Sequence, residues 1–169
     1  MSLGRKLIGG LEGLRGAGGV QTGGTVEVHE SKCRASVQVR EFDKLAVSID
    51  RMDVWTTVAN LPSDKIEQVM ESQARRIERR IGYLVEGLTT LEFDRGDKVI
   101  QMRSAEPFSE RSERRYFELI LAGGCKATLR RYKGSEKDSG RQPVSMNLTM
   151  EVLERLADDL SAALTARSV

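Results

Sequence analysis

The chain has 169 residues with 39% hydrophobic and 31% charged residues, which fits one domain that folds without a disulfide or metal. No apolar run is long enough for a membrane helix, so no membrane partner is expected. The formal net charge of +2 is too small to indicate by itself a nucleic-acid partner or any other charged partner. Cys33 and Cys125 lie far apart and lack metal-site spacing, so we expect a cytoplasmic protein with no cofactor.

The first 24 residues hold more than half of the 16 glycines. Glycine at this density loses too much backbone entropy to form a regular element cheaply, which predicts a flexible arm over residues 1–24. A short amphipathic turn that docks on a partner chain is the alternative, through Leu3, Leu7, Ile8 and Leu11. Residues 25–169 are then one domain, with halves at about 25–82 and 83–169.

The first half begins with strands. Apolar and polar residues alternate from Lys32 to Arg40, which predicts a strand with one buried face, and a second strand runs from Leu45 to about Trp55. Apolar residues at helical spacing then predict a helix over Asp64–Ile81, with Ser63 as its N-cap and Gly82 ending it.

The second half repeats this order. Strands are predicted over 84–93, with a bulge at Gly87, and over 98–103, 115–121, 125–132 and 144–147, with a polar loop between Ala105 and Glu113. Gly123 and Gly124 predict a tight hairpin turn, and Thr149 is the expected cap of a final helix. The fold class is therefore α+β, with a mainly antiparallel sheet and two helices packed on one side. The order strands–helix–strands–helix predicts an internal pseudo-repeat whose other sheet face is open.

The open face is the candidate site. If the apolar residues of each strand point at the helices, the outward residues are mainly Arg, Lys, Gln and Tyr. Cations neutralise phosphates and aromatic rings stack bases, so this composition favours single-stranded nucleic acid. An ordinary solvated sheet face is the alternative, and pairing of the arginines with acids such as Glu118 and Asp50 would favour it. The candidate contacts are Arg34, Arg103, Tyr116, Lys126, Arg130 and Tyr132.

Residues Gly124 to Leu160 resemble the last strand–loop–strand–helix of the transcriptional positive-coactivator and Whirly class. The similarity lies in a Gly-Lys hairpin at Gly124 and Lys126, a basic–aromatic strand end at Arg130 and Tyr132, and a helix start after Asn147 and Leu148. Proteins of this class bind single-stranded DNA across curved sheets. The resemblance implies the same activity here, and a Whirly-like chain of two sheet-plus-helix halves.

Other sites are weaker candidates. Arg75, Arg76, Arg79 and Arg80 cluster on the first predicted helix, where they could contact phosphates or pair with neighbours such as Glu71. His29 has no partnered nucleophile nearby. We therefore expect a non-enzymatic protein that binds single-stranded nucleic acid. The alternatives are a protein-interaction module or homodimeric domain, which is also the homo-oligomer expectation, and a polyphosphate-binding enzyme.

Overall fold

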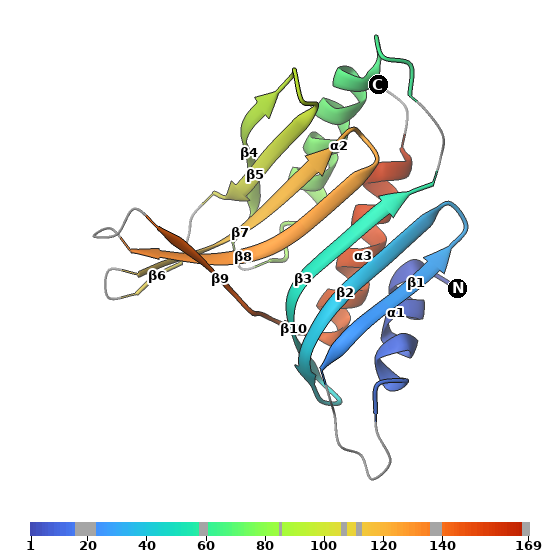
Figure 1. Cartoon of the computed structure of the whole chain (residues 1–169), viewed down its shortest axis with the longest axis vertical. Helices are drawn as coiled ribbons and strands as arrows, with labels where there is room; N and C mark the ends of the chain where they lie inside the picture. Colours follow the sequence, from blue (N-terminus) through green and yellow to red (C-terminus); the bar gives the residue numbers. More distant parts are fainter. Residues whose placement is uncertain are drawn as a thin grey trace.

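The computed structural model describes residues 1–15, 23–57, 61–84, 86–105, 108–110, 113–135 and 140–166. These residues form a ten-stranded antiparallel sheet and three helices, and all three helices lie on the same side of the sheet (Figure 1). The expected α+β class with a mainly antiparallel sheet is confirmed, whereas the expected number of two helices is wrong. No helix in the described ranges has the length and apolar character needed to cross a membrane.

The helices are α1 (Leu3–Glu12), α2 (Ile66–Arg80) and α3 (Met150–Thr165). The strands are β1 (Gly24–Glu30), β2 (Cys33–Phe42), β3 (Ala46–Thr56), β4 (Leu88–Asp94), β5 (Val99–Ser104), β6 (Phe108–Glu110), β7 (Glu113–Ala122), β8 (Lys126–Ser135), β9 (Arg141–Val144) and β10 (Met146–Thr149).

The predicted flexible arm is wrong for residues 3–12, which form α1. Ser2 caps this helix by accepting a hydrogen bond from the backbone N–H of Arg5 at 3.1 Å. Leu3, Leu7 and Leu11 form one stripe and are buried, so the gain from burying them outweighs the entropic cost of the glycines. The helix packs against α3 and β1 of its own chain. Residues 16–22 of the predicted arm lie outside the described residues.

The alternation predicted over 32–40 is confirmed in β2, whose apolar residues Cys33, Ala35, Val37 and Val39 are buried. The strand β1 was not predicted, although Val26 and Val28 alternate with polar residues there. It pairs with β2 along its whole length and forms one edge of the sheet. Two apolar positions beside a glycine-rich stretch are too few to indicate a strand without its partner.

The helix α2 begins two residues later than expected. Its N-cap is Lys65, which makes no side-chain capping bond, and Ile81 is its C-cap. The bulge expected at Gly87 lies instead within β4, where the register with β5 shifts between Thr90 and Glu92. The loop predicted between Ala105 and Glu113 contains the short strand β6, which pairs with the start of β7.

The hairpin between β7 and β8 is confirmed. Gly123 and Gly124 both have positive φ, at 59° and 68°, which other residues adopt only with strain. A Cβ on Gly124 would also lie 2.9 Å from a methyl carbon of Leu61, so the turn fits closely beneath the start of α2. Thr149 caps α3 as predicted and accepts a hydrogen bond from Val152 N–H.

The sheet has the order β1-β2-β3-β8-β7-β5-β4 and is continuous. Beyond Met52 and Leu129, β3 and β8 no longer pair with each other, and the segment Arg141–Thr149 fills the fork. Its first part, β9, pairs with β8 and its second part, β10, pairs with β3 (Figure 1). The helix α2 contacts β4 and β5 from the second half of the chain, whereas α3 contacts β2 and β3 from the first half as well as β8 and β10 from its own.

Candidate nucleic-acid interface

The six candidate residues all lie on the sheet face opposite the helices, because cross-strand partners share a face. One group centres on Trp55 of β3, which is paired with Arg34 of β2 and with Lys126 of β8. The Arg34 guanidinium carbon lies 5.7 Å from the centre of the Trp55 ring, and Lys126 Nζ lies 5.5 Å from it. Both cations are therefore within cation–π distance of one indole.

A second group centres on Tyr116 and Tyr132, which are cross-strand partners in β7 and β8. Their rings stack with centroids 6.0 Å apart and planes 29° apart. Arg103 of β5 lies over Tyr116 at 5.1 Å, and Arg141 of β9 lies over Tyr132 at 4.1 Å. Two arginines thus flank a tyrosine pair, in the order Arg103, Tyr116, Tyr132 and Arg141.

Glu118 binds both of the arginines that flank the tyrosine pair, Arg103 and Arg141. Its Oε2 accepts hydrogen bonds from Arg141 Nη1 at 2.5 Å, Gln101 Nε2 at 2.6 Å and Arg103 Nε at 3.1 Å. The side chain is only 4% exposed, because these donors cover it. Burial by itself would raise the pKa of Glu118, but hydrogen bonds from Arg141, Gln101 and Arg103 outweigh burial, and the pKa lies below its usual value.

Beside Trp55, Asp53 likewise binds several neighbouring donors. Its carboxylate binds Arg51 through two hydrogen bonds of 2.5 and 2.8 Å and accepts a third from Thr128, while Lys126 Nζ lies at 3.4 Å. Burial opposes ionisation of Asp53, but the bonds from Arg51 and Thr128 prevail, so its pKa is lowered. Arg40 also pairs with Asp50 at 3.1 Å. Ion pairs between arginines and acids of this face, which we expected to weaken a nucleic-acid interface, are therefore present.

Two of the candidate arginines differ from the rest. Among the described residues, no carboxylate lies within ion-pairing distance of Arg34 or Arg130. Arg130 of β8 is the cross-strand partner of Glu118, at the centre of the open face. Arg34 Nε is buried and has no hydrogen-bond partner in the described part of the chain.

The sequence did not identify three residues of this surface: Trp55, Asp53 and Arg141. Trp55 and Asp53 lie in a correctly predicted strand, and their alternation with Val54, which is buried, could have placed them outward. Arg141 lies between the predicted strands 125–132 and 144–147, and only the pairing of β9 with β8 brings it over Tyr132. No local pattern could have shown that contact.

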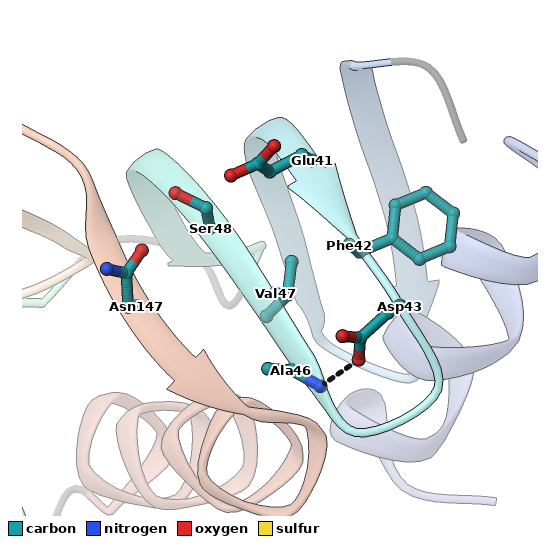
Figure 2. Close-up of a pocket in the computed structure, with 7 residues that line it drawn as sticks. All are labelled: Glu41, Phe42, Asp43, Ala46, Val47, Ser48 and Asn147. Carbon is teal, nitrogen blue, oxygen red and sulfur yellow. Dashed lines mark hydrogen bonds between the residues drawn. The ribbon is translucent and has the colours of Figure 1, made fainter. Parts of the chain in front are cut away.

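An open hollow of about 750 Å³ lies at the far end of β2, β3 and β10. Figure 2 shows Glu41, Ser48 and Asn147 on neighbouring strands along it. Asp43 at its rim binds its own turn, by accepting from the backbone N–H groups of Leu45 and Ala46, and these bonds lower its pKa. The carboxylates of this hollow would repel a phosphate, so it adds nothing to a nucleic-acid interface.

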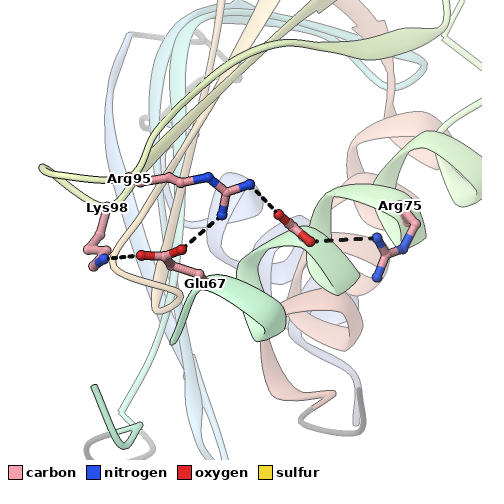
Figure 3. Close-up of polar contacts among 5 residues, drawn as sticks. Glu67, Arg75, Arg95 and Lys98 are labelled. Carbon is pink, nitrogen blue, oxygen red and sulfur yellow. Dashed lines mark hydrogen bonds and ion pairs between the residues drawn. The ribbon is translucent and has the colours of Figure 1, made fainter. Parts of the chain in front are cut away.

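The arginines of α2 serve the fold instead of the open face. Arg75 pairs with Glu71 at 4.0 Å, one helical turn earlier, and Arg80 pairs with Asp159 of α3 at 3.3 Å. From the β4–β5 turn, Arg95 bridges Glu67 and Glu71 at 2.8 Å each, and Lys98 also binds Glu67 (Figure 3). Hydrogen bonds from Lys98 and Arg95 lower the pKa of Glu67. This helix lies on the opposite side of the sheet from Trp55 and the tyrosine pair.

Comparisons of the chain with models of known protein families, with curated proteins and with solved structures found no match. In the described ranges, no three His, Cys, Asp or Glu side chains converge as metal ligands would. The function is therefore argued from the open face itself.

Proposed function

We propose that the protein binds single-stranded nucleic acid along the open face of its sheet. The observation that carries the proposal is that cations flank every aromatic group identified on this face. Arg34 and Lys126 flank Trp55, and Arg103 and Arg141 flank the stacked Tyr116 and Tyr132. Unpaired bases stack on both aromatic rings and guanidinium planes, and phosphates bind the same cations.

Glu118 and Asp53 do not cancel the charge of the cations around them, because each carboxylate is shared between two cations. Glu118 is bound by Arg103 and Arg141, and Asp53 by Arg51 and Lys126. Each cluster keeps a net positive charge. The carboxylates also hold the cations in fixed positions, so less side-chain entropy is lost when a phosphate binds.

Arg34 and Arg130 are the strongest candidates for direct phosphate contacts, because neither has a carboxylate partner among the described residues. They lie on β2 and β8, on either side of β3, so a strand that contacts both crosses the Trp55 region. Lys126, Arg130 and Tyr132 are also residues on which the resemblance to the positive-coactivator and Whirly class depends.

Fluorescence anisotropy of a labelled single-stranded oligonucleotide, measured in about 50 and 200 mM salt, tests the proposal. We expect micromolar or tighter binding in low salt and a loss of roughly 100- to 300-fold in high salt, as five or six phosphate contacts to a single strand predict. Arg130→Gln and Arg34→Gln should each weaken binding and reduce the salt slope by about one. Arg75→Gln, on α2 behind the sheet, is the matched control and should bind as the native protein does.

Tyr132→Ala separates base stacking from charge. Loss of the ring should weaken binding by roughly 1–3 kcal/mol while the salt slope stays nearly unchanged. A protein that shows no binding in low salt, or that binds duplex as tightly as single strands, would refute the proposal. The protein-interaction alternative would then be preferred.

A further inference from the structure

A second pocket lies on the helix-covered side of the sheet and has no part in the open face. It has a volume of about 380 Å³ and is bounded by β7, β8 and β10, by the chain that follows α2, and by the first turn of α3. Its walls are mainly apolar. They include Leu84, Phe117, Leu148 and Val152, and Phe108 of β6, 47% exposed, lies at the rim.

The polar groups of this pocket converge at one place. Glu86, 4% exposed, accepts a hydrogen bond from Arg131 Nη2 at 2.9 Å and another from Ser104 Oγ at 3.0 Å. Ser104 Oγ in turn accepts from Phe117 N–H at 2.7 Å. Both carboxylate oxygens of Glu86 are thus occupied, and the Arg131 guanidinium is held 4.7 Å from the Phe117 ring.

The arginines of the pocket are less completely paired than Glu86. Arg131 Nε is buried and has no acceptor among the described residues. Arg115 also lines the pocket and is about half exposed, and its one ion pair with a described residue is a long contact of 3.6 Å with Glu113. The Nε atom of Arg131 is closed to solvent, so a ligand in the pocket would meet the rest of the Arg131 side chain, which is 21% exposed.

We propose that this pocket binds a small organic monocarboxylate with a compact aromatic or branched aliphatic body. The apolar body would contact Leu84, Leu148 and Val152, and the carboxylate would accept hydrogen bonds from Arg131 and Arg115. A planar carboxylate matches the N–H edge of a guanidinium. A doubly charged phosphate fits less well, because Glu86 and Glu113 lie close to the same arginines.

The volume agrees with this ligand class. Pockets that enclose small ligands begin at roughly 300 Å³ and combine apolar walls with a few convergent polar groups. A nucleic-acid strand needs an extended groove, whereas this pocket is short and is separated from the open face by the sheet. The inference is therefore independent of the proposed nucleic-acid binding, and either can fail without the other.

Two-dimensional NMR titration of the whole chain with phenylacetate tests the proposal, with the uncharged phenethyl alcohol as the matched probe. Phenylacetate should shift signals of Leu84, Leu148 and Val152 saturably, with a dissociation constant on the order of 1 mM. The alcohol should bind the same residues about tenfold more weakly, which corresponds to one lost charge-assisted contact. Signals of Trp55 and Tyr132 on the open face should stay in place.

Two variants locate the ligand. Arg115→Gln keeps the fold, since the side chain is half exposed, and should weaken phenylacetate part of the way to the level of the alcohol, because Arg131 still binds the carboxylate. Val152→Trp should fill the pocket and abolish binding of both probes, with Arg75→Gln as the unaffected control. Equal binding of both probes, shifts confined to the open face, or no saturable shift up to about 20 mM would overturn the proposal.

Discussion

Gly4 of α1 lies directly against the backbone of Glu154 in α3. A Cβ at Gly4 would be 2.1 Å from the carbonyl oxygen of Glu154, which no side chain can accommodate. The Gly4 N–H also donates a 2.7 Å hydrogen bond to Asp158 Oδ1. The two helices therefore touch backbone to backbone, and a glycine that counted toward the predicted flexible arm is what permits α1 to dock.

Gly4→Ala should destabilise the protein by on the order of 3 kcal/mol, because α1 must move away from α3 and expose Leu7 and Leu11. Gly9→Ala is the matched control on the same helix, since nothing lies within 4 Å of its added Cβ. That variant should be more stable by up to about 1 kcal/mol, as alanine favours a helix over glycine. Urea denaturation measures both. Equal effects of the two substitutions would contradict the docking.

Arg130 and Arg131 are adjacent in β8, but their side chains leave opposite faces of the sheet. Arg131→Met removes the partner of the buried Glu86 and should cost on the order of 3 kcal/mol of unfolding free energy. Arg130→Met should change stability by no more than about 0.5 kcal/mol, because it affects a surface side chain. Thermal and urea unfolding of both variants check the difference. Similar values would mean that Glu86 does not depend on Arg131.

The lowered pKa of Glu118 predicts a stability change in acid. Because the pKa is lower in the folded protein than the usual 4.5, ionised Glu118 stabilises the fold above about that pH. This contribution is lost as the pH falls through the lower, folded-state value. Glu118→Gln should therefore flatten the dependence of unfolding free energy on pH below about pH 5. A variant with the native acid dependence would show that other carboxylates cause it.

The same substitution should strengthen nucleic-acid binding. Without the Glu118 carboxylate, Arg103 and Arg141 are no longer neutralised and can bind phosphates, while the glutamine keeps the shape of the side chain. Affinity in low salt should rise about tenfold, and the salt slope should steepen by about one. Glu113→Gln, a surface carboxylate that binds Arg115 and Lys133 instead, is the control. A weaker-binding Glu118→Gln protein would show that the carboxylate's positioning role prevails over its charge.

Local patterns in the sequence were enough to predict most of the sheet. Period-two alternation correctly indicated β2 and β3, the adjacent glycines indicated the β7–β8 turn, and Thr149 marked the start of α3. These features depend on residues close together in the chain. The helix α1 was missed because its stability comes from contacts with residues about 150 positions away, such as Gly4 with Glu154 and Asp158. The glycine content of residues 1–24 by itself favours a flexible arm instead of a helix.

Only part of the candidate surface could be predicted, because the rest also depends on contacts between distant parts of the chain. Strand alternation was enough to place Arg34, Lys126 and Tyr132 outward. The register between strands decides which residues meet, so the grouping around Trp55 and the bridge from Glu118 to Arg141 could not be predicted from one strand at a time. The pocket beside Glu86 and Arg131 also required the tertiary fold, since its lining comes from five separate segments, near Tyr83, Phe108, Phe117, Arg131 and Leu148.

The segment that fills the sheet fork has a consequence for synthesis on the ribosome. One side of β3 is completed only by β8 and β10, both from the last third of the chain, and α1 docks on the C-terminal helix. A nascent chain that ends before residue 126 would therefore leave one edge of β3 unpaired and the α3-facing side of α1 uncovered. Chains of such high contact order fold slowly and aggregate more readily while incomplete. Folding of the first half of the sheet is thus expected to wait until β8, β10 and α3 have left the ribosome.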